Sequence, residues 1–222
     1  MWQARRGRWT LETVTQVQDV VSVRDEQELF DRTAHLFTHA DEVVCAANDL
    51  HTWATMRGNT DLPQPRRPGV RGRKIYRPQQ LLDPASAPHL QELREAGMEI
   101  RISEREINET IIIDHRIAIL AAGRGYTVLL RPDLVHGIKS LVEATWRTST
   151  ALAAYETRFA ELRQYTPQLI ELLASGCTDE KAAREMGVGL RTYRRRVAEL
   201  MSVLGASSRF QAGARAREAG LV

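Results

Sequence analysis

The sequence TDEKAAREMGVGLRTYRRRVAELMSVLG, residues 178–205, contains two helix patterns with a break between them. Thr178 is a residue type that caps helices, and acidic residues follow it where the helix dipole favours negative charge. Gly187 ends the first pattern, and a second helix is predicted from about Leu190 to Leu204. Two helices joined by a short turn that contains glycine are typical of a helix-turn-helix, whose second helix enters the major groove of DNA.

The second predicted helix has an apolar stripe and a basic surface. Its apolar residues recur at helical spacing and must face other helices: Leu190, Tyr193, Val197, Leu200 and Leu204. Its outward residues are arginines around one small residue: Arg191, Arg194, Arg195 and Ala198. Guanidinium groups bind phosphate and can fork onto guanine, so this surface predicts contact with DNA. A solvated helix face is the alternative interpretation of such an arginine cluster.

Further helices are predicted on both sides of this pair. Thr166 followed by Pro167 indicates a helix start, and that helix ends at Gly176. Another helix is predicted over residues 208–220. From Thr166 onward the chain has nine Lys and Arg residues against six Asp and Glu, which equals the whole net charge of +3. The pattern predicts a basic, all-α domain of four helices.

Several local motifs extend across this segment. They are Thr166-Pro167, Gly176, Ala183-x-x-Met186-Gly187-Val188, Arg191-Thr192, Leu204-Gly205 and Ser208-Arg209-Phe210-Gln211-Ala212. With these motifs, residues 166–222 closely resemble the LuxR-type (GerE-like) DNA-binding domain. Two positions depart from the family pattern: Gly189 replaces a capping Ser or Thr, and Tyr193 replaces a small valine. Glycine is an acceptable N-cap, so neither change removes the fold.

The resemblance implies roles for individual residues. Base edges would be contacted by Arg194, Arg195 and Ala198, and the DNA backbone by Arg191 and Thr192. Lys181 and Arg184, on the preceding helix, are expected to add backbone contacts. The expected DNA-binding set is therefore Thr178, Lys181, Arg191, Thr192, Arg194, Arg195 and Ala198. The partner is double-stranded DNA, and a homodimer is expected because two-fold symmetry lets paired half-sites add their free energies.

The first part of the chain alternates between helix and strand patterns. Helices are predicted over residues 25–40 and 84–97, and strands over 42–49, 70–78, 98–103, 109–123 and 125–133. This order predicts an α/β domain, a mixed sheet with helices, within residues 1–148. Residues 57–69 are expected to be an exposed loop. A long helix without a break is predicted over residues 134–162, and we take 149–165 as a linking helix before the domain 166–222.

Three stretches of the first domain carry a second resemblance. GVRGRKIYRPQQLLDP (69–84), HLQELREAGMEIRIS (89–103) and IIIDHRIAIL (111–120) resemble the phospholipase D-like half-domain of TrmB-related transcription regulators. Catalytic members carry His-x-Lys-x4-Asp. When Asp114 takes the last place, Ile107 and Glu109 occupy the first two, and neither supports phosphodiester cleavage. We therefore predict no enzymatic activity; a phosphodiesterase-type enzyme acting on nucleic acid is the alternative.

A degenerate domain of this kind is expected to sense a small-molecule effector or to mediate dimerisation. The candidate ligand-binding residues are polar groups near strand ends: Asn48, Asp49, Arg101, Glu109, Asp114 and His115. Ordinary polar residues at strand ends are the alternative interpretation.

Composition limits the other functions. Cys45 and Cys177 lack the spacing of a zinc site, a structural disulfide is not expected, and neither a metal nor a cofactor is predicted. No apolar run approaches the roughly 18 residues that cross a bilayer, and the N-terminus lacks the apolar core of a secretory signal. We therefore expect a soluble, cytoplasmic, sequence-specific transcription regulator.

Overall fold

The computed structural model describes residues 19–46, 70–84, 86–123 and 125–221. The chain divides into two compact units. The first comprises Met1–Tyr76 and Leu93–Ser149, and the second comprises Arg77–Glu92 and Thr150–Val222. The sequence does not indicate that residues 77–92 belong with the C-terminal helices.

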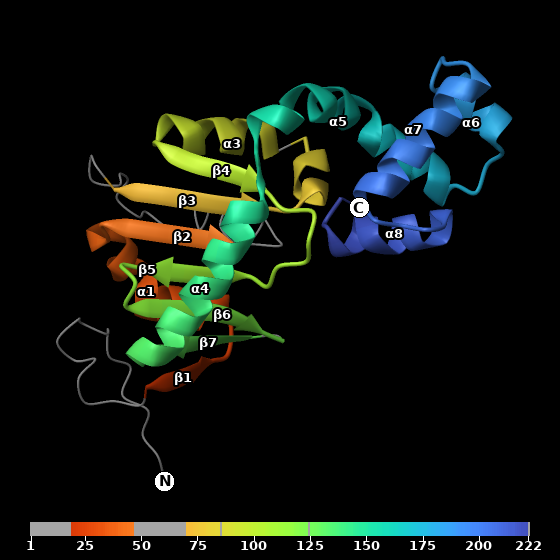
Figure 1. Cartoon of the computed structure of the whole chain (residues 1–222). Coiled ribbons are helices and arrows are strands. Elements are labelled where there is room, and N and C mark those ends of the chain that lie inside the picture. The colour runs from red at the N-terminus through yellow and green to blue at the C-terminus, as the bar shows by residue number, and fades with distance from the viewer. Residues whose placement is uncertain (1–18, 47–69, 85, 124, 222) are drawn as a thin grey trace, which may run out of the picture. The chain divides into compact units, whose positions relative to one another are not determined.

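The first unit is built on a mixed sheet. Its strands are β1 (Val20–Val23), β2 (Glu42–Ala46), β3 (Arg71–Tyr76), β4 (Met98–Ile102), β5 (Thr110–Ile113), β6 (Ile117–Ala122) and β7 (Gly125–Leu129). They are ordered β1-β7-β6-β5-β2-β3-β4 (Figure 1). The pairs β2–β3 and β3–β4 are parallel, and the other pairs are antiparallel. The predicted mixed sheet with helices is therefore confirmed.

Two helices cover opposite faces of this sheet, α1 (Glu26–His39) and α4 (Pro132–Thr148) (Figure 1). Successive strand residues point to opposite faces, so Val43 and Cys45 pack in the cluster with α1. Val44 and Ala46 pack in the cluster with α4. Both faces of β2 are buried, which explains its continuous apolar sequence.

Charged side chains connect the first residues of β2 and β3 to α4. Arg73 donates to both carboxylate oxygens of Glu143, at 2.6 and 3.1 Å, and to Glu42 Oε1 at 3.0 Å. Its guanidinium carbon lies 5.3 Å from the ring centroid of Trp146. Arg71 pairs with Glu42 at 3.1 Å.

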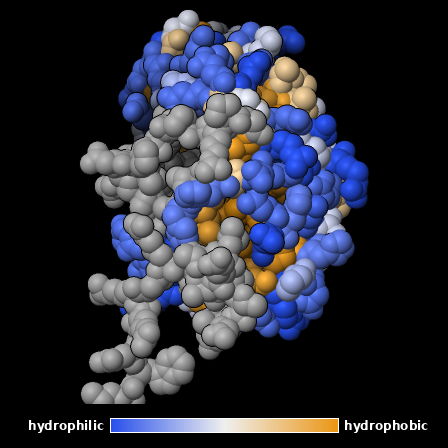
Figure 2. All heavy atoms as spheres, turned by 90° about the vertical axis from the view of Figure 1, so that its left-hand side faces the viewer, coloured by the Kyte–Doolittle hydropathy of each residue, from blue (hydrophilic) through white to orange (hydrophobic). Residues whose placement is uncertain are grey.

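β2 and β3 begin at the left of Figure 1, and the face seen from that side is mostly hydrophilic, with hydrophobic residues visible over its middle (Figure 2).

Replacement of Glu143 by Gln should lower the free energy of unfolding of the first unit by about 1–2 kcal/mol near neutral pH, because it removes the charge from this pair. Arg73 holds the pKa of the Glu143 carboxyl below its usual value. A lowered pKa stabilises the fold above the pKa of the unfolded chain, about 4.3, and this contribution disappears as the pH falls through the lower, folded value. The difference between wild type and Glu143→Gln should therefore shrink in acid.

Tryptophan fluorescence during urea unfolding measures this effect, since Trp2, Trp9, Trp53 and Trp146 all belong to the first unit. The matched control is Glu99→Gln, which removes the same charge from an exposed position on β4. A difference that is equal at pH 7 and in acid would show that the ion pair is not its source.

The predicted unbroken helix over residues 134–162 is wrong. α4 ends at Thr148, and a new helix begins at Ala153, after the two-residue strand β8 (Thr150–Ala151). Thr148 and Ser149 donate their hydroxyls to carbonyls of the last turn of α4, at 2.7–3.3 Å, which competes with continued helix formation. Arg101 also donates to the carbonyl of Trp146 at 3.0 Å and so satisfies a helix-end acceptor.

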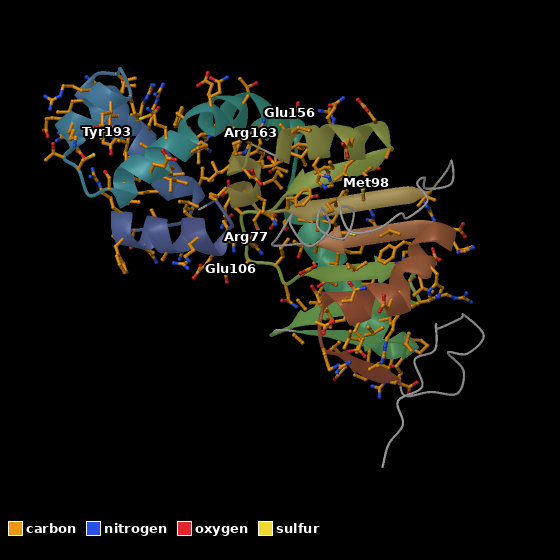
Figure 3. The ribbon with its side chains drawn as sticks, turned by 180° about the vertical axis from the view of Figure 1, so that it is seen from behind. Arg77, Met98, Glu106, Glu156, Arg163 and Tyr193 are labelled. Carbon is orange, nitrogen blue, oxygen red and sulfur yellow. The ribbon has the colours of Figure 1, made fainter. Side chains whose placement is uncertain are left out.

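The second unit is helical. It contains the 3-10 helix η2 (Pro78–Leu82), most of α3 (Ser86–Glu95), α5 (Ala153–Ala174), α6 (Asp179–Glu185), α7 (Leu190–Val203) and α8 (Arg209–Glu218). Buried side chains of α5 and α7 supply much of its core, among them Phe159, Leu162, Leu169, Tyr193, Val197 and Leu200. Arg163 of α5, labelled in Figure 3, donates to the carbonyl of Leu81 in η2 at 3.4 Å. Burial lowers the pKa of this guanidinium.

The helix start predicted at Thr166 and Pro167 is also wrong, and with it the separate linking helix over 149–165. Both residues lie inside α5. The Thr166 hydroxyl donates back to the carbonyl of Leu162 at 2.8 Å instead of capping a helix. Proline lacks the amide that would reach the carbonyl four residues earlier, yet α5 continues through it. Buried residues before and after Pro167, such as Leu162 and Leu169, stabilise the helix on both sides.

Candidate nucleic-acid interface

The connection between α6 and α7 is a tight turn that local sequence explains. Thr178 accepts a hydrogen bond from the amide of Lys181 at 3.3 Å and so caps α6. Gly187 adopts φ +64, a left-handed conformation that glycine tolerates well. The amide of Val188 donates to the carbonyl of Ala183 at 3.0 Å, which closes the end of α6. Gly189 is the N-cap of α7 and supplies no side-chain bond.

α7 has two contrasting surfaces. Tyr193, Val197 and Leu200 are buried, and Tyr193 lies among the helices of the second unit in Figure 3. The outward surface, which we call the arginine ridge, consists of exposed residues: Arg191, Arg194, Arg195 and Ala198. Thr192 is half-buried beside it. The predicted burial pattern of this helix is confirmed, except that Leu190 is only half-buried.

Arg196 does not belong to the arginine ridge. Its guanidinium carbon lies 4.3 Å from the ring centroid of Tyr165 on α5. The Tyr165 hydroxyl donates to Glu199 at 3.1 Å, and Glu199 also accepts from Arg158 at 3.2 Å. Burial, and then the charge of Glu199, raise the pKa of Tyr165 to about 12. This cluster fixes α7 against α5. The sequence alone does not distinguish Arg196 from its neighbours, because four arginines fall within six positions.

One carboxylate reaches into the arginine ridge. Asp179, the first residue of α6, accepts from Arg194 Nε at 2.8 Å and pairs with Arg209 Nη2 at 2.6 Å. These two guanidinium groups hold the pKa of the Asp179 carboxyl below its usual value, with the Arg194 hydrogen bond as the largest cause. From the sequence, the helix dipole alone accounts for an acidic residue at this position, and the contact between Asp179 and Arg194 is not predicted.

The predicted contacts on α6 lie at its exposed start. Lys181 is exposed and pairs with Glu185 at 3.8 Å, across one helical turn. Such an exposed pair contributes little to stability, so it does not prevent Lys181 from binding a phosphate. Thr178 is exposed, and its hydroxyl serves the helix cap.

Those candidate ligand-binding residues of the first unit that the structure describes do not form one cluster. Asn48 and Asp49 lie outside the described residues. Arg101 lies over the ring of Trp146, with 4.8 Å to the centroid, and donates to carbonyls at the end of α4. This arrangement gives Arg101 a structural role in holding α4.

Asp114 and His115 lie in the turn between β5 and β6, where both have positive φ. Asp114 Oδ1 accepts from the amides of Asp41 and Glu42 at 2.8 and 2.9 Å. His115 Nε2 lies 3.3 Å from Glu42 Oε2. Glu109 stands at the other end of β5, about 16 Å away along an extended strand. The residues aligned with the Lys and Asp of the phospholipase D motif are therefore separated by the whole strand.

A small hollow of about 170 Å³ adjoins this turn. Its lining residues are His35, Leu36, His39, Ile113, Asp114, Arg116 and Ile117. Pockets that hold drug-sized ligands usually measure about 300–1,000 Å³, so this hollow is small for an effector. Among the residues described, no group of three or more His, Cys, Asp or Glu is placed to hold a metal ion. No helix in the described ranges is long and apolar enough to span a bilayer.

The chain is similar in sequence to a known regulatory protein. The chain is 34% identical over 145 residues to the "Bialaphos biosynthetic pathway regulatory protein" of Streptomyces hygroscopicus. The match covers 63% of this chain and 57% of that protein, so the chain matches little more than half of the relative's length. No family model matches the chain.

Similarity to solved structures is weaker. TrmBL2, an archaeal chromatin protein, gives a TM-score of 0.45 at 14% identity, over 62% of this chain and 55% of that one. Nuc, a phospholipase D family member from Salmonella typhimurium, gives 0.40 at 10% identity, over 53% and 86%. NucT from Helicobacter pylori gives 0.38 at 12% identity, over 60% and 96%. TM-scores below 0.5 are too low to carry a functional conclusion.

Proposed function

We propose that the chain is a sequence-specific DNA-binding transcriptional regulator and that its second unit is a LuxR-type helix-turn-helix domain. The arginine ridge of α7 is the observation that carries the proposal. A helix with a buried apolar stripe and an exposed row of guanidinium groups, joined to α6 by a tight turn, fits the major groove. The residues proposed to contact DNA are Thr178, Lys181, Arg191, Thr192, Arg194, Arg195 and Ala198.

The relative in Streptomyces hygroscopicus supports the regulatory part of the proposal, because that protein is described as a pathway regulator. We infer that the protein is located in the cytoplasm, where it would meet its DNA. We also infer a homodimer, since one small domain reaches few base pairs and paired half-sites add their free energies.

The first unit is proposed to sense a small effector or to mediate dimerisation, as a degenerate phospholipase D-like domain. Three observations favour this role over phosphodiester cleavage. Ile107 stands where the motif requires a nucleophilic histidine, and Glu109 replaces the phosphate-binding lysine. Asp114 also accepts two backbone amides, so its carboxylate already has a structural role.

Mapping of the chromosomal sites that the protein occupies tests the proposal, followed by binding measurements on duplexes from those sites. Affinity should fall steeply with salt, by a slope of about 0.9 in log Kd against log salt for each phosphate contacted. A scrambled duplex of the same composition should bind at least about 1,000-fold more weakly. Absence of enriched sites, together with equal affinity for both duplexes, would contradict sequence-specific binding.

A further inference from the structure

Arg194 is held in place before any DNA arrives. Although its side chain is 58% exposed, its Nε donates to Asp179 Oδ2 at 2.8 Å. An exposed arginine normally samples many rotamers, and ordering it on a ligand has an entropic cost. The contact with Asp179 fixes the guanidinium plane of Arg194 in the free protein.

The carboxylate that holds Arg194 is itself fixed on two sides. Asp179 Oδ1 pairs with Arg209 Nη2 at 2.6 Å, so each oxygen has its own guanidinium partner. The Asp179 side chain is only 14% exposed. It also lies in the first turn of α6, where the helix dipole favours a negative charge. Asp179 can therefore act as a fixed support.

The contact uses one edge of the guanidinium and leaves its end available. Nε is taken by Asp179, whereas neither Nη atom of Arg194 has a hydrogen bond among the described residues. The nearest other carboxylate oxygen, on Glu180, is 3.9 Å from Nη2, which is beyond hydrogen-bond distance. Two parallel N–H groups on the two Nη atoms match the O6 and N7 acceptors of guanine in the major groove.

We propose that Asp179 is a positioning residue for base recognition: it holds Arg194 so that Nη1 and Nη2 bind a guanine end-on. This inference rests on the proposed function, because it requires α7 in the major groove. Asp179 is expected to raise the ratio of affinities for the preferred site and for other sequences. Its positioning of Arg194 helps only at the preferred site, whereas a carboxylate near DNA repels phosphates wherever the protein binds. Loss of its charge should weaken binding to the preferred site and strengthen binding to other sequences.

Three variants separate positioning from charge. Asp179→Asn removes the charge at nearly unchanged shape. Asp179→Glu keeps the charge but moves the carboxylate by one methylene, and it serves as the second test if Asp179→Asn folds poorly. Glu180→Gln is the matched control, because it removes a charge from the adjacent residue, which makes no hydrogen bond to Arg194. Circular dichroism establishes that each variant is folded.

Wild type and each variant are used to select duplexes from a pool with a randomised core, and Kd is then measured for the selected and for a scrambled duplex. Arg194→Ala identifies the base pair that Arg194 reads. Asp179→Asn and Asp179→Glu should lose the guanine preference at that same position, with a fall of about 10-fold in the ratio of selected to scrambled affinity. Glu180→Gln should keep the preference.

Each possible result has one meaning. If wild type selects no motif, the proposed function fails. If wild type selects a motif that both Asp179 variants keep, positioning by Asp179 is wrong while DNA recognition stands. If Asp179→Asn tightens binding to the selected and the scrambled duplex equally, Asp179 only repels DNA, and the inference is again overturned.

Discussion

Replacement of Arg194 and Arg195 together by Ala should weaken binding to the preferred duplex by about 2–6 kcal/mol. Each arginine can make a bidentate contact that is worth about 1–3 kcal/mol, and both side chains project from the exposed side of α7. The two residues are adjacent, so their effects need not add. Titration of a labelled duplex at fixed salt, with the two single variants beside the double variant, measures the loss.

The matched control is Arg217→Ala. This change removes a positive charge from the exposed surface of α8 in the same small unit. It should alter affinity for all sequences slightly and leave the preferred sequence unchanged. If the double variant and Arg217→Ala have equal affinities for the preferred duplex, α7 does not read DNA.

Replacement of Leu200 by Ala should lower the free energy of unfolding of the second unit by about 2–5 kcal/mol. Leu200 is 0% exposed and lies in the middle of the buried stripe of α7, so the change removes packed atoms and leaves a cavity. Far-ultraviolet circular dichroism follows the loss of helix as temperature rises. DNA binding should be lost at the temperature where this transition occurs.

Two internal comparisons accompany this measurement. Ser202→Ala, at an exposed position on the same helix, should change stability by less than about 0.5 kcal/mol. Tryptophan fluorescence reports the first unit, which contains every tryptophan, and shows whether the damage stays local. A melting curve for Leu200→Ala that coincides with that of Ser202→Ala would place Leu200 outside the core.

The strength of periodic signals explains which parts of the fold could be predicted. Burial fixes both the apolar run of β2 and the stripe on α7, so the sequence predicts the first from a continuous valine-rich run and the second from helical spacing. Helix ends are harder to predict from the sequence, because the effects of Thr148, Ser149 and Pro167 depend on the residues that surround them in the fold. The hydrogen bond that Arg101 donates to the Trp146 carbonyl and the apolar packing around Pro167 decide these cases, and both depend on tertiary structure.

The candidate interface shows the same division. Exposure of Arg191, Arg194 and Arg195 follows from helical periodicity, whereas their contact with DNA stays a prediction. The pairing of Asp179 with Arg194 joins residues on two helices and has no signature in a single sequence. In the first unit, proximity in sequence was misleading: Glu109 and Asp114 are close along the chain, yet β5 carries them to opposite ends of a strand.

Photo-crosslinking from position 198 tests the central claim most directly. Ala198 lies in the middle of the arginine ridge and is exposed, so a photoreactive residue there should crosslink to bases of the preferred duplex. Gly213, exposed on α8 with open space around its Cα, is the control position. We predict strong crosslinks from position 198 and few from 213. Crosslinks that are absent at 198 on a duplex that the protein still binds would show that α7 does not enter the groove.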